Sequence, residues 1–188
     1  GNRYDNYFFY PSRFAYYKRQ ELALKAYEKF KEENPDSDFR LVIAGGVNEE
    51  KKDYYEEIKE RAEKIEGVEV KSDVPGDEWE DLYRNAYSIL FCAINEDWGI
   101  IPIEAGSYEK PIISVNEGGP TESVLQDETG LLLDNSEEMA EAMEKLVNDE
   151  ELVKEMGKKG KKRSKEYTWD KFVEKFDDKM SEVLDEEK

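Results

Sequence analysis

Hydrophobic and polar positions along the chain follow two alternating patterns. Short apolar runs such as residues 87–94 (YSILFCAI) are typical of strands buried on both faces of a parallel sheet. Longer stretches such as residues 18–34 place apolar side chains on one face and charges on the other, as amphipathic helices do. Strands are predicted at 6–11, 39–46, 68–71, 87–94, 111–115 and 130–134, and helices at 18–34, 50–65, 77–86, 137–147, 150–165 and 169–184. Asp77 is the predicted N-cap of the helix at 77–86, and Ser136 that of the helix at 137–147. This alternation predicts an α/β fold with a doubly wound, Rossmann-like six-stranded parallel sheet.

The stretch 95–106 follows the most apolar run and is expected to be central to function. It turns at Gly99 and enters a predicted helix, which tolerates Pro102 only within its first turn. Glu96 and Glu104 lie on either side of this turn. Carboxylates accept hydrogen bonds from hydroxyl groups, whereas the free N–H groups at a helix start attract negative charge. We therefore expect a ligand that carries both a sugar and a phosphate.

The assumed strand order predicts where this ligand binds. In the common doubly wound order, the first and fourth strands are neighbours where the winding reverses, and ligands bind at their carboxyl ends. The first strand is followed by Ser12, Arg13 and the loop to Lys18, and the fourth by 95–99. The dinucleotide fingerprint G-x-G-x-x-G is missing after the first strand, which disfavours a nicotinamide enzyme. Arg13 and Lys18 are then the groups expected to meet the phosphate charge.

Composition narrows the functional classes. The formal charge of −19, from 47 acidic and 28 basic residues, argues against nucleic acid as a partner. The only cysteine, Cys92, lies in the apolar run and is predicted to be a buried, inert thiol. The chain has no histidine, which excludes Ser-His-Asp and Cys-His nucleophilic sites and histidine-containing zinc sites. With one cysteine, no signal peptide and no apolar run near the roughly 20 residues that span a bilayer, we expect a cytoplasmic protein.

Several motifs together carry a family resemblance. They are Arg13-x-x-x-x-Lys18-Arg19 before a helix, Ala44-Gly45-Gly46 after a strand, Glu96-x7-Glu104 within EDWGIIPIEAGSYEKPIIS, GGPTESV at 118–124, TGLLL at 129–133 and YTWDKF at 167–172. In this order the motifs resemble the donor half of retaining GT-B glycosyltransferases of family 4, the "group 1" nucleotide-sugar transferases. The resemblance covers essentially the whole chain. Two positions depart from it, because Arg19 stands where many relatives have Gly and Trp98 where Phe is common.

The resemblance implies a role for each candidate residue. Arg13 and Lys18 would hold the donor diphosphate and stabilise the departing nucleoside diphosphate without proton transfer, so they count with Glu96 as catalytic. Glu96 would bind hydroxyls of the transferred sugar, and Glu104 those of the ribose. The remaining donor contacts would come from the backbone N–H groups of Trp98, Gly99, Ile100 and Ile101, from Gly45 and Gly46 beside the nucleoside, and from Asp73 and Val74 near the base.

The resemblance also implies an activity and a domain organisation. Residues 1–188 would form a single nucleotide-sugar-binding domain, with a C-terminal helix at about 168–188 packing toward an N-terminal acceptor domain that the chain does not contain. The expected reaction is retaining, metal-independent hexosyl transfer to a glycan or lipid-linked acceptor. No metal or cofactor is expected, and the donor could be a GDP-, UDP- or ADP-sugar. The chain could be an excised domain or one subunit of a split enzyme, and it is expected to bind nucleotide but to transfer sugar poorly.

Other interpretations of the same residues remain open. Glu96 and Glu104 could be the acid and nucleophile of a glycosidase, although the resemblance assigns them to donor binding. The chain could also be a non-catalytic nucleotide-sugar binding module. A GT-B sugar-nucleotide epimerase is a third alternative, which the lack of histidine disfavours. The basic segment 154–165 is predicted to be a solvated helix face, with peripheral contact to the inner face of a membrane as the alternative.

Overall fold

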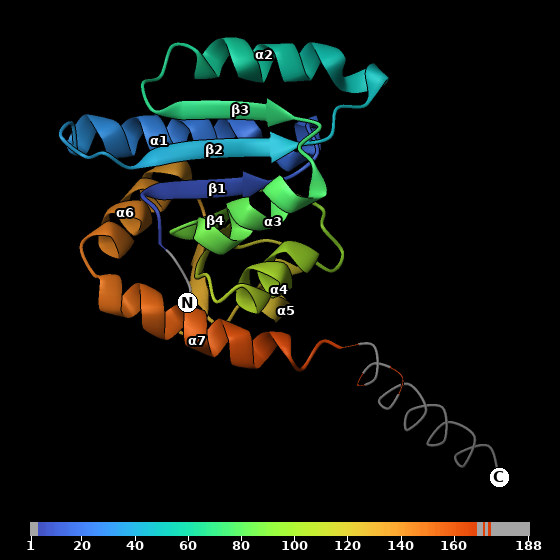
Figure 1. Ribbon diagram of the computed structural model, residues 1–188, viewed down its shortest axis with the longest axis vertical. Coiled ribbons are helices and arrows are strands. Elements are labelled where there is room, and N and C mark those ends of the chain that lie inside the picture. The colour runs from blue at the N-terminus through green and yellow to red at the C-terminus, as the bar shows by residue number, and fades with distance from the viewer. Residues whose placement is uncertain (1–3, 169–170, 172, 174–188) are drawn as a thin grey trace.

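The structure, a computed structural model, describes residues 4–168, 171 and 173. Its centre is a parallel six-stranded sheet with the strand order β3-β2-β1-β4-β5-β6 (Figure 1). The strands are β1 (Tyr7–Pro11), β2 (Arg40–Gly45), β3 (Val68–Ser72), β4 (Ser88–Phe91), β5 (Ile112–Val115) and β6 (Gly130–Leu133). The winding starts at β1 and reverses between β1 and β4, which confirms the predicted doubly wound fold.

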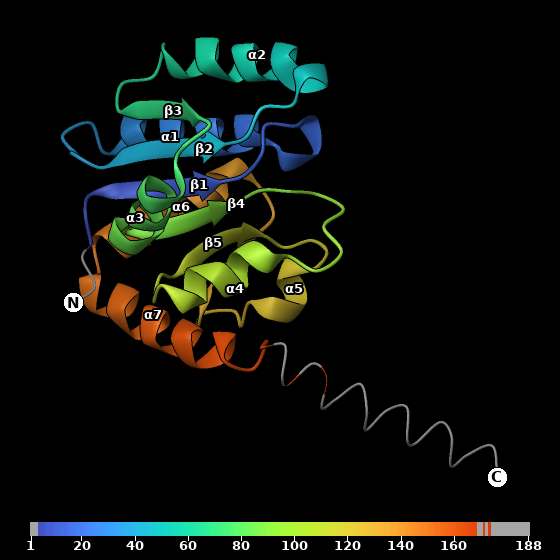
Figure 2. The same ribbon diagram turned by 45° about the vertical axis from the view of Figure 1, so that its right-hand side comes forward.

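Helices cover both faces of this sheet (Figure 2). They are α1 (Gln20–Glu33), α2 (Lys52–Ala62), α3 (Gly76–Asn85), α4 (Ile100–Ser107), α5 (Pro120–Ser123), α6 (Ser136–Val147) and α7 (Glu150–Ser164), with two short 3-10 helices, η1 (Tyr16–Lys18) and η2 (Glu49–Lys51). Helices α1 and α6 pack together on one face, α3 and α4 lie on the other, and α7 packs against α4. The helix predicted at 169–184 lies outside the described residues, as does nearly all of the proposed C-terminal helix at 168–188.

Two local features differ from the predicted elements. The helix expected to begin at Lys18 is divided into η1 and α1, because Arg19 between them adopts a left-handed conformation with φ 55° and ψ 44°. The short helix α5 was not predicted, and Pro120 occupies its first position. Proline suits that position because its fixed φ is helical and the N–H that it lacks would have no partner within the helix.

Two predicted helix caps were wrong by one or two residues. Ser136 was expected to cap α6, but the N-cap is Asn135, whose side chain accepts a hydrogen bond of 2.9 Å from the Glu138 N–H. Asp77 was expected to cap α3, but Pro75 is the N-cap and makes no side-chain capping hydrogen bond. Asp77 lies instead in the first turn, where its negative charge still favours the helix N-terminus.

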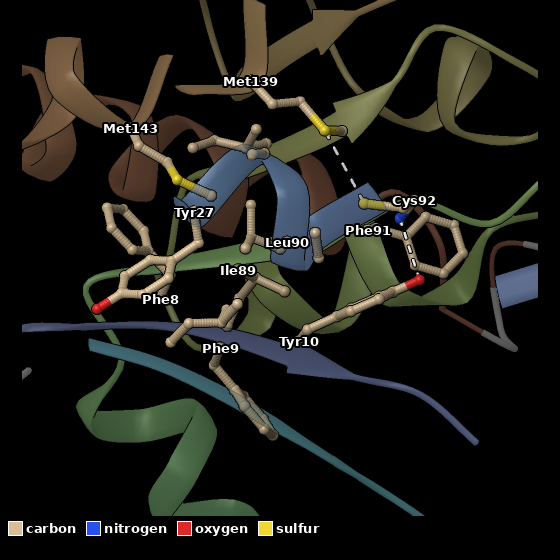
Figure 3. Packing of buried hydrophobic residues seen from close by; sticks show 14 of the residues in the cluster. Phe8, Phe9, Tyr10, Tyr27, Ile89, Leu90, Phe91, Cys92, Met139 and Met143 are labelled. Atoms are coloured by element: carbon tan, nitrogen blue, oxygen red, sulfur yellow. Dashed lines mark hydrogen bonds between the residues drawn. The ribbon is translucent and has the colours of Figure 1, made fainter. Parts of the chain in front are cut away.

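The core is built from strands whose side chains alternate between the two faces (Figure 3). Phe8 packs edge-on against Phe30 of α1 with ring centroids 5.6 Å apart, whereas Phe9 packs against α3 on the opposite face. Cys92 is fully buried, and its Sγ lies 3.9 Å from the sulfur of Met139. Burial raises the pKa of the Cys92 thiol to about 12, so the thiol stays neutral. The prediction of a buried cysteine is confirmed.

Helix α7 fits closely against α4 through glycine residues. A Cβ on Gly106 of α4 would lie 2.5 Å from the carbonyl oxygen of Gly160, and one on Gly157 would lie 2.1 Å from that of Glu109. Larger side chains at these positions would force the two helices apart. The glycines within the basic segment thus fix the position of α4, which carries Glu104.

Candidate functional site

The loops that follow β1 and β4 meet at the carboxyl end of the sheet. These two strands pair directly, with Phe8 opposite Ser88. Beyond the strands, η1 is attached to the end of β4, because the Ile94 N–H donates a 2.9 Å hydrogen bond to the carbonyl oxygen of Tyr17. The buried Tyr10 hydroxyl donates to the carbonyl oxygen of Lys18. The predicted meeting of the first and fourth loops is therefore present.

Lys18 and Glu96 form an ion pair across this junction. The Nζ of Lys18 lies 2.5 Å from Oε2 of Glu96, and only 12% and 26% of the two side chains are exposed. The ammonium also lies 5.6 Å from the ring centroid of Phe91 and 5.1 Å from that of Tyr17, within the range of cation–π attraction. The structure thus brings together a predicted phosphate-binding cation and a predicted sugar-binding carboxylate.

Arg13 lies on the same loop and is linked to this pair through a tyrosine. Its guanidinium is exposed and donates a 3.1 Å hydrogen bond from Nη2 to the hydroxyl of Tyr17. A second ion pair crosses from η1 to the loop after β5, where Nη1 of Arg19 lies 3.4 Å from Oε1 of Glu117. The basic residues were predicted from the sequence, but Tyr17 and Glu117 were not, because neither is a marked position of the family motifs.

The loop between β4 and α4 is held by the loop that precedes α5. The Gly119 N–H donates a 2.7 Å hydrogen bond to the carbonyl oxygen of Glu96. A Cβ on Gly119 would lie 2.3 Å from the carbonyl carbon of Trp98, so only glycine permits this approach. Gly99 is left-handed with φ 66° and is the N-cap of α4, and Pro102 falls in the first turn as predicted.

The start of α4 presents both backbone donors and apolar side chains. The first N–H groups of a helix have no hydrogen-bond partner inside it. The N–H groups near Ile100 and Ile101 can therefore bind an anion. The side chains of Trp98 and Ile100 are 54% and 56% exposed at this end of the sheet. The Trp98 ring meets that of Tyr167 edge-on, with centroids 5.6 Å apart.

Glu104 is half-buried on α4 and has a partner that the sequence did not predict. Its Oε2 accepts a 2.7 Å hydrogen bond from the hydroxyl of Tyr83, which is only 1% exposed on α3. Burial and the adjacent Glu104 carboxylate raise the pKa of Tyr83 well above its ordinary value, so the tyrosine stays a neutral donor. This bond fixes the orientation of the carboxylate.

The predicted nucleoside contacts lie at the ends of β2 and β3, which pair at Gly45 and Ser72. Gly45 is buried, and a Cβ there would lie 1.9 Å from the carbonyl oxygen of Ser12, so the packing of the β1 loop alone requires this glycine. Gly46 is exposed, and a Cβ there would meet no atom within 4 Å. Asp73 is exposed with a left-handed φ of 53°, whereas Val74 is half-buried against the core.

The described residues give no support to a metal centre or to a spanning segment. No group of three histidine, cysteine or acidic residues within the described part of the chain could hold a metal ion. Of the helices that the structure describes, none combines the length and the apolar character that crossing a membrane requires.

The basic segment 154–165 forms part of α7, and several of its charges are paired. Lys154 lies 2.8 Å from both Glu150 and Glu151, and Arg163 lies 2.9 Å from Glu166. The acids on either side of the segment therefore compensate part of its charge. Membrane contact through this segment stays the alternative to the predicted solvated helix face.

Comparison with known proteins then decides the family. The profile of the family described as glycosyl transferases group 1 matches residues 2–163. The chain belongs to this family. Among curated relatives, the chain is 32% identical over 182 residues to the α-1,3/1,6-mannosyltransferase alg-2 of Neurospora crassa. That alignment covers 82% of this chain but only 38% of the relative, so the chain spans less than half of that protein's length.

Solved structures support the same fold. A structure of Alr3699/HepE from Anabaena in complex with UDP and glucose superposes with a TM-score of 0.79 at 17% identity, covering 98% of this chain and 48% of that one. The C-terminal domain of a glycosyl transferase group 1 family protein, LpcC from Francisella tularensis, gives 0.74 at 17% identity, with 88% and 87% covered. The match to an isolated C-terminal domain agrees with the predicted GT-B half-domain.

Proposed function

We propose that this group 1 domain binds a nucleoside-diphosphate sugar and serves as the donor half of a retaining, metal-independent hexosyltransferase. The observation that carries the proposal is the ion pair of Lys18 and Glu96 at the carboxyl ends of β1 and β4. It places a cation suited to a diphosphate beside a carboxylate suited to sugar hydroxyls. The bound UDP and glucose of the Anabaena structure and the mannosyltransferase name of the Neurospora relative support this class of donor.

The proposed mechanism needs only charge and orientation from this chain. Arg13, Lys18 and the free N–H groups at the start of α4 would stabilise the diphosphate as it leaves, because they oppose its growing negative charge. Glu104, held by Tyr83, would accept hydrogen bonds from the ribose, and Glu96 from the transferred sugar. Glu96 must exchange its contact with Lys18 for the sugar hydroxyls when the donor binds.

A calorimetric panel of UDP, GDP and ADP and their hexose conjugates tests donor binding. We expect one base class to bind, and Arg13→Ala or Glu104→Ala to weaken that binding roughly tenfold or more, because each removes a charge-assisted contact. Arg84→Ala is the matched control, since Arg84 pairs with Glu80 and Asp81 on the surface of α3. Failure of every nucleotide to bind would overturn the proposal.

The acceptor, a glycan or a lipid-linked sugar, would be held mainly outside these 188 residues, by an N-terminal domain or a partner subunit. The chain covers 38% of the Neurospora relative, which leaves room for such a region. We therefore expect the isolated chain to bind donor but to transfer little sugar. Robust sugar transfer by the isolated chain would contradict this part of the proposal. If the full-length protein binds the donor but transfers no sugar, the domain would instead be a non-catalytic binding module.

A further inference from the structure

Tyr17 is in contact with both cations of the candidate site, although no family motif marks it. Its hydroxyl accepts the 3.1 Å hydrogen bond from Nη2 of Arg13. Its ring centroid lies 5.1 Å from Nζ of Lys18. One side chain therefore links two basic groups that would otherwise repel each other.

The backbone of Tyr17 is fixed more firmly than the exposed side chain of Arg13. Its carbonyl oxygen accepts the hydrogen bond from the Ile94 N–H at the end of β4, and the next carbonyl accepts one from the buried Tyr10 hydroxyl. A further hydrogen bond of 2.8 Å, from the Lys18 N–H to the carbonyl oxygen of Ala15, closes the η1 turn. The tyrosine side chain thus projects from a rigid turn.

Arg13, in contrast, is an exposed side chain with many rotamers. Ordering such a side chain when a ligand binds costs conformational entropy, and a partner that orders it beforehand reduces that cost. From this arrangement we propose that Tyr17 is a positioning residue, which holds Arg13 through its hydroxyl and Lys18 through its ring face for the diphosphate of the donor. The proposal rests on the proposed donor-binding function.

The neighbouring Tyr16 provides a matched control. It belongs to the same 3-10 helix and is 60% exposed, against 40% for Tyr17. Its ring packs against Tyr54 of α2, with centroids 4.4 Å apart. Tyr16→Phe removes a hydroxyl from the same turn but leaves the contacts of Tyr17 with Arg13 and Lys18 in place. It therefore measures any general effect of such a substitution on nucleotide affinity.

The experiment measures the affinity of the folded variants for UDP, GDP or ADP, whichever the wild type binds. Tyr17→Phe removes only the contact with Arg13 and should weaken binding about threefold, whereas Tyr17→Leu also removes the ring and should weaken it about tenfold. Tyr16→Phe should bind like the wild type. Thermal unfolding of Tyr17→Phe should match that of the wild type, which separates positioning from loss of fold.

A double-mutant cycle with Arg13→Ala distinguishes positioning from a structural effect. If Tyr17 acts through Arg13, Tyr17→Phe should cause no further loss of affinity once Arg13 is alanine. Fully additive losses, or a Tyr17→Phe variant that binds like the wild type, would overturn the role of Tyr17 and leave the donor proposal intact. If the wild type binds none of the three diphosphates, both proposals fail.

Discussion

At the scale of single residues, the structure contains a buried cation remote from the candidate site. Lys110 is only 1% exposed, and its Nζ lies 3.9 Å from the ring centroid of Tyr4. Burial lowers the pKa of Lys110 to about 8 from its ordinary 10.5, because the charged form is poorly solvated there. This burial could not be predicted from the sequence, since Lys110 directly follows Glu109 in a charged turn before β5.

This burial predicts how stability depends on pH. The unfolded chain binds a proton at Lys110 up to about pH 10.5, whereas the folded chain releases it near pH 8, so folding is favoured as the pH rises. Between pH 7 and 9 the wild type should gain roughly 1 kcal/mol in unfolding free energy relative to Lys110→Met. Urea unfolding at several pH values measures the difference. If the unfolding free energies of the wild type and of Lys110→Met change equally with pH, the prediction is refuted.

Arg19 gives a second prediction at this scale, because its left-handed backbone disfavours any side chain with a Cβ. Comparing Arg19→Gly with Arg19→Ala isolates the backbone effect, since both variants lose the ion pair with Glu117. The glycine variant should be more stable by about 1 kcal/mol in urea unfolding. Equal stabilities would show that the turn relaxes at no cost.

At the scale of elements, the pattern predicted all six strands, because five of them are mainly apolar runs and β3 alternates between apolar and polar residues. The common doubly wound order that was assumed for them agrees with the observed sheet. The features that the pattern did not predict are short elements, helix caps and the partners of single side chains. The 3-10 turn η1 and the four-residue α5 are too short to show a period. Asn135 and Ser136 are both good caps, so sequence alone could not choose between them. The partners Tyr17, Tyr83 and Glu117 depend on how loops and faces meet, which no spacing along the chain encodes.

The adjacent glycines after β2 provide an element-scale prediction. Gly45→Ala would place a Cβ 1.9 Å from the carbonyl oxygen of Ser12, whereas Gly46→Ala would meet open space. We expect Gly45→Ala to lower the free energy of unfolding by about 3 kcal/mol through forced separation of the β1 and β2 ends. Gly46→Ala should change it by less than about 0.5 kcal/mol. Similar stabilities for the two variants would contradict the close approach.

At the scale of the whole molecule, the fold carries a formal charge of −19. The described ion pairs lie mostly at the surface, where each contributes little. The excess of carboxylates therefore acts as a general repulsion that opposes the compact state. This repulsion follows from composition alone, because it depends on the number of charges and hardly on their placement.

Salt should accordingly stabilise the protein. Raising sodium chloride from low concentration to about 0.5 M shortens the screening length and should increase the unfolding free energy by roughly 1 kcal/mol. The effect should shrink at acidic pH, where protonation removes part of the negative charge. Thermal unfolding across a salt series at two pH values measures both trends. Destabilisation by salt at neutral pH would show that specific ion pairs outweigh the net repulsion.

The hydrogen bond from Gly119 to Glu96 and the close approach of Gly119 to Trp98 have a consequence for engineering. The two loops form a matched backbone pair, so residues 95–99 grafted from another member of the family would contact a segment 117–120 to which they are not matched. Under the proposed donor-binding function, donor preference should transfer between homologues only when both segments are exchanged together. A library designed to change the accepted sugar should therefore recombine these segments as one cassette.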